Sequence, residues 1–168
     1  TRFRARSEAL SSTVEIVERI EDAPAAIARF LTAQNLTRSA VAWPQLAGLD
    51  WVGAGLQVES RAARGDDLVG ITGVFCAVAE TGTLAVLSGA DTPASASLLP
   101  ETHIAIVPAA RIVPGMEEAF GLVRTEWGEL PRAVNFISGP SRTGDIEQTL
   151  VLGAHGPYRV HIVIVSGW

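Results

Sequence analysis

Residues 102–107 read Thr-His-Ile-Ala-Ile-Val, and this run decides the class of the fold. Its apolar residues follow one another without alternation, which is typical of a strand covered on both faces, as in a parallel sheet. A segment of helical period comes next, with Pro131 beyond its end. Its apolar face is formed by Met116, Ala119, Phe120, Val123 and Trp127. This succession predicts an α/β domain with a mostly parallel sheet flanked by helices.

The same alternation extends in both directions along the chain. Further strands are expected at 13–19, 39–42, 133–137 and 158–165, and two more within 68–87, on either side of a polar turn. Helices are expected after Asp22, as its cap, and over 144–152. Without repeats or linkers, residues 1–168 form one domain. The residues expected to be buried are Ile104, Ile106, Val134, Ile162 and Ile164.

Composition excludes several classes of function. The net charge is −5, from 18 acidic and 13 basic residues, which argues against a nucleic-acid partner. Every basic residue is arginine, so lysine chemistry is excluded. Cys76 is the single cysteine, which excludes internal disulfides and cysteine-ligated zinc or iron–sulfur sites. We expect no metal and no cofactor in this chain. With no secretory signal and no apolar run of membrane length, we expect a cytoplasmic protein without a membrane partner.

Three patterns imitate known sites but lack essential parts. Gly53-Ala54-Gly55 lacks the third glycine of a dinucleotide fingerprint, so a glycine-rich loop is expected. The segment 139–144 resembles a serine nucleophile elbow, but its second glycine is one residue late. The histidines 103, 155 and 161 show no metal-ligand spacing, and His161 is expected to be a core or edge residue.

The turn Glu80-Thr81-Gly82-Thr83 places a carboxylate and two hydroxyls between two apolar strands. One interpretation is a tight turn with Gly82 at positive φ. The other is functional, because open α/β sheets bind ligands at strand ends. In that case Glu80 acts as a base or nucleophile, provided that burial raises its pKa.

The segment 138–147 runs from a strand through a polar turn into a helix. One interpretation is structural: Ser141 or Thr143 caps the helix, while Asp145 and Glu147 favour the positive end of its dipole. The other is an anion site, in which free N–H groups and hydroxyls bind the anion and Arg142 clamps it. The two acidic residues favour an anion of carboxylate size over a phosphate.

The two polar segments are expected to form one site, because the carboxyl ends of parallel strands share an edge of the sheet. Glu80 is its candidate catalytic residue. The candidate ligand-binding residues are Thr81, Gly82, Thr83, Ser138, Gly139, Ser141, Arg142, Thr143, Asp145 and His155. His155 is the weakest member, because the helix before it would carry it toward the opposite edge.

Between residues 68 and 165 the sequence resembles the lactate-utilisation protein C (LutC) family. Four motifs, which occur in the same order as in that family, carry the resemblance. They are A-E-T-G-T (79–83), L-P-x-x-H (99–103), S-G-P-S-R-T-x-D-I-E (138–147) and G-x-H-G-P (153–157). The resemblance implies a fold like that of the sugar-phosphate isomerase, CoA-transferase and formyltetrahydrofolate cyclo-ligase superfamily. It also implies a role in oxidising L-lactate to pyruvate, alongside partner proteins that carry iron–sulfur clusters.

Three functions stay open at this point. The first is a subunit of a lactate-oxidising complex that binds a small carboxylate or stabilises the assembly. The second is a stand-alone enzyme, an acyl or CoA transferase or an isomerase, with Glu80 as nucleophile or base. The third is a structural or regulatory binding module, which predicts no pocket near the motifs.

Overall fold

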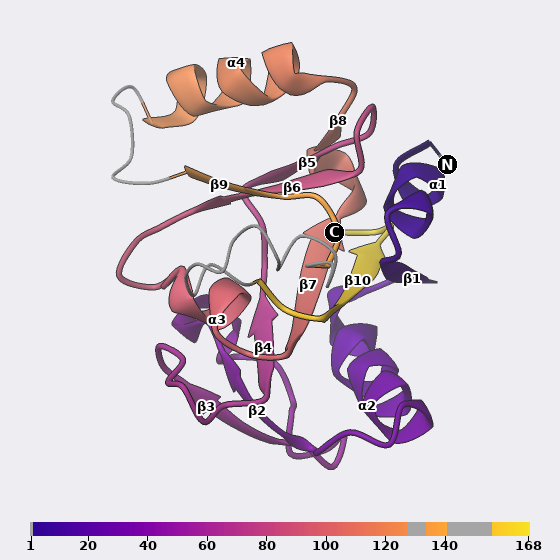
Figure 1. Ribbon diagram of the computed structural model, residues 1–168, viewed down its shortest axis with the longest axis vertical. Coiled ribbons are helices and arrows are strands. Elements are labelled where there is room, and N and C mark those ends of the chain that lie inside the picture. The colour runs from indigo at the N-terminus through magenta and orange to yellow at the C-terminus, as the bar shows by residue number, and fades with distance from the viewer. Residues whose placement is uncertain (1, 128–133, 141–155) are drawn as a thin grey trace, which may run out of the picture.

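The computed structural model describes residues 2–127, 134–140 and 156–168, and its largest element is a six-stranded sheet (Figure 1). The strand order is β1-β10-β7-β4-β2-β3, and every neighbouring pair is parallel. The strands are β1 (Thr13–Val17), β2 (Ser39–Ala42), β3 (Gln57–Ser60), β4 (Val69–Thr72), β7 (Thr102–Pro108) and β10 (Arg159–Val165). The predicted α/β fold with a mostly parallel sheet is confirmed.

A second, four-stranded sheet has the order β8-β5-β6-β9. Its strands are β5 (Cys76–Val78), β6 (Thr83–Leu87), β8 (Ile112–Val113) and β9 (Val134–Ile137). β6 is antiparallel to both β5 and β9, whereas β5 and β8 are parallel. The expectation of two strands within 68–87 was wrong, because this stretch holds three. The chain leaves the large sheet after Thr72 and enters the small one at Cys76.

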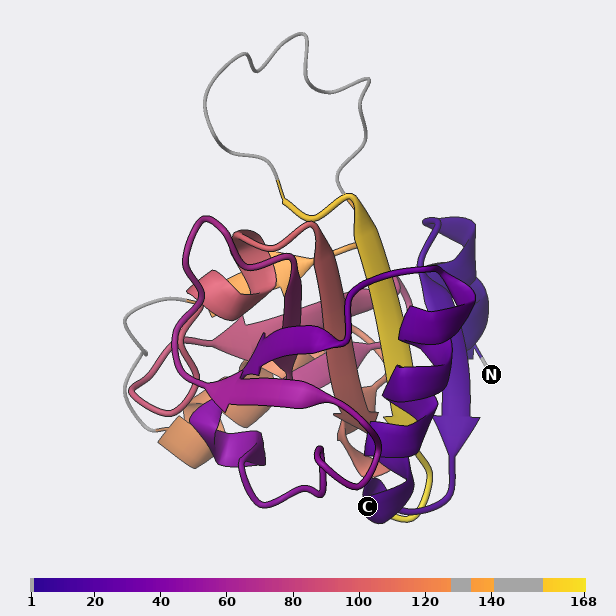
Figure 2. The same cartoon turned by 90° about the horizontal axis from the view of Figure 1, so that it is seen from below.

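The two faces of the large sheet are covered differently. Ile104 and Ile106 of β7 pack in a core cluster with helix α2 (Ala23–Ala33). Ala105 and Val107, which point the other way, pack with Phe3 of helix α1 (Arg2–Ala9) and with Leu84 of the small sheet. Helix α4 (Met116–Trp127) lies on the outer side of the small sheet, as Figure 1 shows. Figure 2 shows α2 running along the large sheet.

Short helical segments complete the described parts of the chain. They are η1 (Ile20–Asp22), η2 (Pro44–Leu46), α3 (Ser95–Leu98) and η3 (Ala109–Arg111). Asp22 precedes α2, but its carboxylate accepts a hydrogen bond from the Arg19 N–H at 3.3 Å and does not cap the helix. The helix expected over 144–152 lies outside the described residues. Within those residues, no helix is long and apolar enough to cross a membrane.

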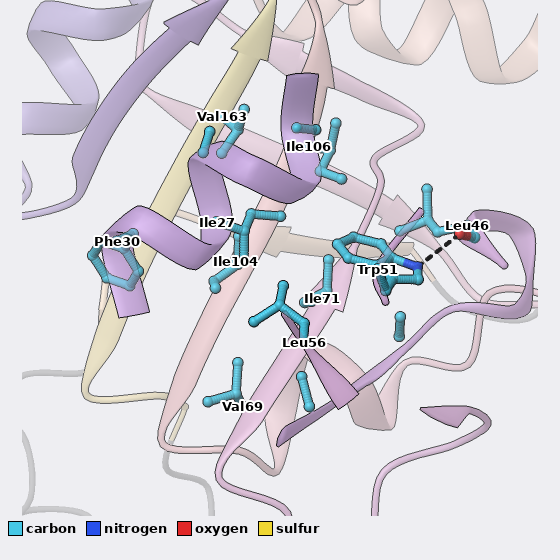
Figure 3. Packing of buried hydrophobic residues seen from close by; sticks show 14 of the residues in the cluster. Ile27, Phe30, Leu46, Trp51, Leu56, Val69, Ile71, Ile104, Ile106 and Val163 are labelled. Carbon is cyan, nitrogen blue, oxygen red and sulfur yellow. Dashed lines mark hydrogen bonds between the residues drawn. The ribbon is translucent and has the colours of Figure 1, made fainter. Parts of the chain in front are cut away.

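Burial follows the prediction at four of the five positions. Ile104, Ile106, Ile162 and Ile164 are buried, and Figure 3 shows the first two in the cluster beneath α2. Val134 is only partly buried, because it opens β9, an edge strand with one neighbour in its sheet. In the same cluster, the Trp51 indole donates to the Leu46 carbonyl at 3.1 Å (Figure 3).

The glycine-rich stretch at 53–55 is a loop, as the missing third glycine predicts. The Asp50 carboxylate accepts a hydrogen bond from the Gly53 N–H at 2.9 Å, and Gly55 has a φ of +82°. A side chain at position 53 would overlap that carboxylate, so the loop is closed by its own acidic residue. These contacts account for both glycines without a bound dinucleotide.

Candidate functional site

The polar turn after Val78 is the tip of the hairpin between β5 and β6. Gly82 has a φ of +69°, and its N–H donates to the Val78 carbonyl at 2.9 Å. A Cβ at this position would lie 2.9 Å from backbone atoms of Arg6 and Ser7. Helix α1 therefore packs directly on the turn, and both backbone conformation and space favour glycine here.

Three hydroxyl groups form a continuous chain beside this turn. Thr81 Oγ1 and Thr83 Oγ1 are 2.7 Å apart, and Thr83 Oγ1 is 2.8 Å from Ser138 Oγ. Thr83 is buried, whereas Thr81 and Ser138 are exposed. We call Thr81, Thr83 and Ser138 the hydroxyl chain. The structure thus brings together two of the motif segments that lie 55 residues apart in sequence.

The reason for this contact differs from the one predicted. We expected the two turns to meet because parallel strands share their carboxyl edge, but β6 and β9 are antiparallel neighbours. Leu84 pairs with Ile137, so Thr83 at the start of β6 lies beside Ser138 after the end of β9. Gly139 packs on Leu10, just before β1. The hydroxyl chain therefore lies near the amino edge of the large sheet, not at its carboxyl edge.

Gly139 is fixed by the same N-terminal segment as Gly82. Its φ is +84°, and a Cβ there would lie 2.6 Å from the Leu10 carbonyl oxygen. The segment formed by α1 and Leu10 thus contacts both motif glycines. Its role is to hold the two turns against each other, a role for which the sequence gives no local motif.

The hydroxyl chain has one proton to offer a ligand. Three hydroxyls carry three protons, and the two internal hydrogen bonds use two of them. The remaining O–H lies at Ser138 when the bonds run toward Ser138, and at Thr81 when they run the other way. Because the order can reverse, either exposed end can donate to an acceptor oxygen, and the chain polarises toward it.

Glu80 lies next to this chain but does not meet the condition set for a buried base. Its side chain is exposed, and its backbone N–H donates to the Pro114 carbonyl at 3.0 Å. Its carboxylate approaches the start of α4, because a Cβ on Gly115 would lie 3.1 Å from Glu80 Oε2 and 3.0 Å from Glu118 Oε1. The burial that a base or nucleophile role would require is absent at Glu80, since the residue is exposed beside a second acid.

The other candidate residues stay predictions. Ser141, Arg142, Thr143, Asp145 and His155 lie outside the described residues. The end of their last motif is described: Gly156 and Pro157 lead into β10, and the Tyr158 N–H donates to the Glu101 carbonyl at 2.9 Å. Gly156 and Pro157 therefore lie at the amino edge of the large sheet. The 99–103 motif, which leads into β7, lies at the same edge.

Sequence reasoning missed His103 as a residue of this edge. It is the second residue of β7 and fully buried, with Nε2 2.8 Å from Thr72 Oγ1. Among the described residues its Nδ1 has no hydrogen-bond partner. Burial lowers the pKa of His103 to about 4, so the ring is neutral at pH 7. The available signal was its place as the last residue of L-P-x-x-H.

His161 is the core residue that the sequence predicts. Its Nδ1 is 2.7 Å from Thr13 Oγ1, and its ring stacks on Phe30 with centroids 3.9 Å apart. Burial lowers its pKa to about 4, and the nearby Glu15 opposes this shift. Both contacts join β10 to neighbouring elements, so the residue stabilises packing.

Comparison with known proteins gives one consistent answer. The family model for the LUD domain matches residues 1–165. The chain is 44% identical over 101 residues to "Lactate utilization protein C" of Bacillus subtilis, covering 58% of this chain and 42% of that protein. It is 37% identical over 128 residues to the Bacillus licheniformis protein of the same name, covering 69% and 53%. The chain thus spans about half the length of these relatives.

A solved structure extends the likeness to nearly the whole fold. The crystal structure of a DUF162 family protein from Deinococcus radiodurans superposes with a TM-score of 0.70 at 26% identity. The match covers 98% of this chain and 94% of that one. Because the LUD domain model matches residues 1–165, the chain belongs to the LUD domain family.

Proposed function

We propose that this chain serves lactate utilisation as a subunit that binds a small carboxylate at the hydroxyl chain. The observation that carries the proposal is its similarity, at 37–44% identity, to proteins named lactate utilization protein C. Two of the four motifs meet at the Thr83–Ser138 contact, and the other two lead into the neighbouring strands β7 and β10, which supports a common role for them.

The chemistry of the proposed ligand suits this edge. A 2-hydroxy acid such as L-lactate carries a carboxylate and a hydroxyl, both of which accept hydrogen bonds. The free O–H at Ser138 or Thr81 donates to one of these oxygens. From the sequence, Arg142 supplies the charge that balances the carboxylate. The proposal therefore divides binding between a described hydroxyl chain and a predicted arginine clamp.

We propose that iron–sulfur clusters of partner proteins accept the electrons. Oxidation of lactate to pyruvate removes two electrons, which requires a cofactor. A single cysteine cannot hold an iron–sulfur cluster, since such clusters are bound by several thiolates. Iron–sulfur partner proteins in a lactate-oxidising complex are therefore part of the proposal.

The test removes one hydroxyl without changing the shape of its residue. Thr83→Val interrupts the chain at its centre, whereas Thr83→Ser keeps the oxygen. Calorimetric titration with L-lactate should show Thr83→Val binding about three- to tenfold more weakly than wild type, the effect of losing about one hydrogen bond. Thr83→Ser should bind within about twofold of wild type. Equal affinities for all three proteins would refute the role of the hydroxyl chain.

A second experiment addresses the partners. The tagged wild-type chain should co-purify from its native cell with proteins that contain iron and sulfide, and this fraction should oxidise L-lactate. Turnover of L-lactate by the isolated chain alone would contradict the subunit role, because it would place the electron acceptor within this polypeptide.

A further inference from the structure

A pocket of about 390 Å³ lies at the carboxyl edge of the large sheet, the edge opposite the hydroxyl chain. Trp43 follows β2, Gly73 follows β4, Pro108 ends β7, and Trp168 lies three residues beyond β10. Open α/β sheets bind their ligands at this edge. The volume is within the range of small-molecule sites. Position and size therefore both fit a ligand site.

The walls of the pocket are aromatic. Trp43 is buried, and its indole N–H donates to the Pro93 carbonyl at 3.0 Å, which fixes the ring. Phe75 carries the Arg111 guanidinium 4.8 Å from the centre of its ring. Trp168 is 45% exposed at the same pocket, so a bound ligand would cover indole surface that now faces solvent. Such surfaces favour stacking with a planar ring.

The charge in the pocket is already balanced. Arg111 is the one cation among the described lining residues, and its Nη1 and Nη2 each lie 2.9 Å from a carboxylate oxygen of Glu126. Its Nε donates to the Phe75 carbonyl at 2.9 Å. These bonds use three of the five guanidinium N–H groups, and Glu126 neutralises the charge, so an anionic ligand would meet no unpaired positive charge. The exposed Gln45 amide, which both donates and accepts, can instead bind a neutral polar edge.

Gly73 keeps this space open. Its φ lies outside the left-handed range, so backbone conformation does not require glycine. A Cβ there would lie 3.5 Å from Gln45 Oε1 and 3.6 Å from Trp43 Cζ3, which is ordinary contact. A larger side chain would extend among the residues that line the pocket. The glycine is thus explained by the cavity that it leaves.

We infer that this pocket, lined by Trp43, Gln45, Gly73, Phe75, Arg111 and Trp168, is a second ligand site that takes an uncharged planar aromatic ring. The ring stacks on the exposed Trp168 indole, and the Gln45 amide binds its polar edge. The site is separate from the hydroxyl chain, because Leu87, which lines the pocket, lies four residues beyond Thr83 on β6, about 13 Å at about 3.3 Å per residue. Its ligand is therefore a different molecule from the proposed carboxylate.

Indole N–H signals in ¹H–¹⁵N spectra of the full chain test this inference. The chain has four tryptophans. The probes are three neutral planar rings, namely adenosine, nicotinamide and lumichrome, and cyclohexanecarboxamide is the saturated control. At least one planar probe should shift Trp43 and Trp168 in a saturable manner, with a smaller effect on Trp51, whose indole bonds within the core. The saturated control should shift none of them.

Matched variants locate the binding. Gly73→Val should weaken the dissociation constant of the bound probe at least tenfold, and Gly73→Ala should weaken it less. Gly121→Ala on α4, where a Cβ meets no atom within 4 Å, should leave it unchanged. Gln45→Ala should weaken it about threefold or more, the loss of one hydrogen bond. No saturable shift with any planar probe, equal shifts with the saturated control, or unchanged binding in Gly73→Val would overturn the inference.

Discussion

Acidification from pH 7 to pH 5 is expected to lower the free energy of unfolding by about 4 kcal/mol, because two buried histidines stay neutral in the folded chain. His103 and His161 are 0% and 4% exposed, and burial lowers the pKa of each to about 4. In the unfolded chain the pKa of histidine is about 6.5. Between these values the unfolded chain binds more protons than the folded chain, so stability falls as the pH falls.

The magnitude follows from the two pKa values. At pH 5 an unfolded histidine is almost fully protonated, whereas a folded one with a pKa of about 4 carries about a tenth of a proton. Integrating the difference from pH 7 to pH 5 gives about 2 kcal/mol for each histidine. The contribution is present in full above about pH 6.5 and is lost as the pH falls toward 4.

Urea unfolding at pH 7, 6 and 5 measures this loss, and two variants assign it. His161→Phe keeps the stack on Phe30, and His103→Gln keeps a partner for Thr72. Each variant should show a pH-dependent loss about 2 kcal/mol smaller than wild type. Asp67→Asn is the control, because Arg61 lowers the pKa of Asp67 and its titration lies below this pH window. A loss under about 1 kcal/mol in wild type, or a full loss in both histidine variants, would refute the reasoning.

Three further predictions concern packing and reactivity. Gly82→Ala and Gly139→Ala should each lower the free energy of unfolding by about 1–3 kcal/mol. Both glycines have positive φ and contact the α1 segment. Chemical denaturation followed by circular dichroism measures the loss. Ile104→Ala should lower it by about 2–5 kcal/mol, whereas Ile104→Val should lower it by about 1 kcal/mol, since the residue is fully buried. Cys76 should react with a thiol reagent only after denaturation, because burial raises the pKa of its thiol; rapid labelling of the native chain would contradict its position in the core.

The sequence predicts the large sheet well because its strands carry a simple signal. Residues 102–107 and 158–165 are apolar on both faces, and both form central strands. The small sheet was not foreseen, since β5 and β4 are separated by only three residues within one apolar stretch. Periodicity cannot show that the chain changes sheets at Gly73, because both strands are buried on both sides.

The contact between the two candidate segments could be predicted from the sequence, but its place in the fold could not. The hydroxyls of Thr83 and Ser138 were selected as polar residues that end apolar strands, and they do meet. Their location depends on an antiparallel pairing across 55 residues, which local sequence does not encode. The contact of α1 with both turns likewise depends on tertiary packing. The place of His103 in this edge was missed because its burial and its contact with Thr72 depend on tertiary packing.

The position of β10 has a consequence for how the chain reaches this structure. β10 lies between β1 and β7, so the first strand pairs only with one that begins at residue 159. Until β10 emerges from the ribosome, β1 has no neighbour in the sheet, and one edge of β7 stays open. Closing a loop of this length disfavours early pairing, so the large sheet is completed only after β10 has been made. Until then the nascent chain presents two strands with unpaired edges, β1 and β7, the kind of surface that chaperones protect.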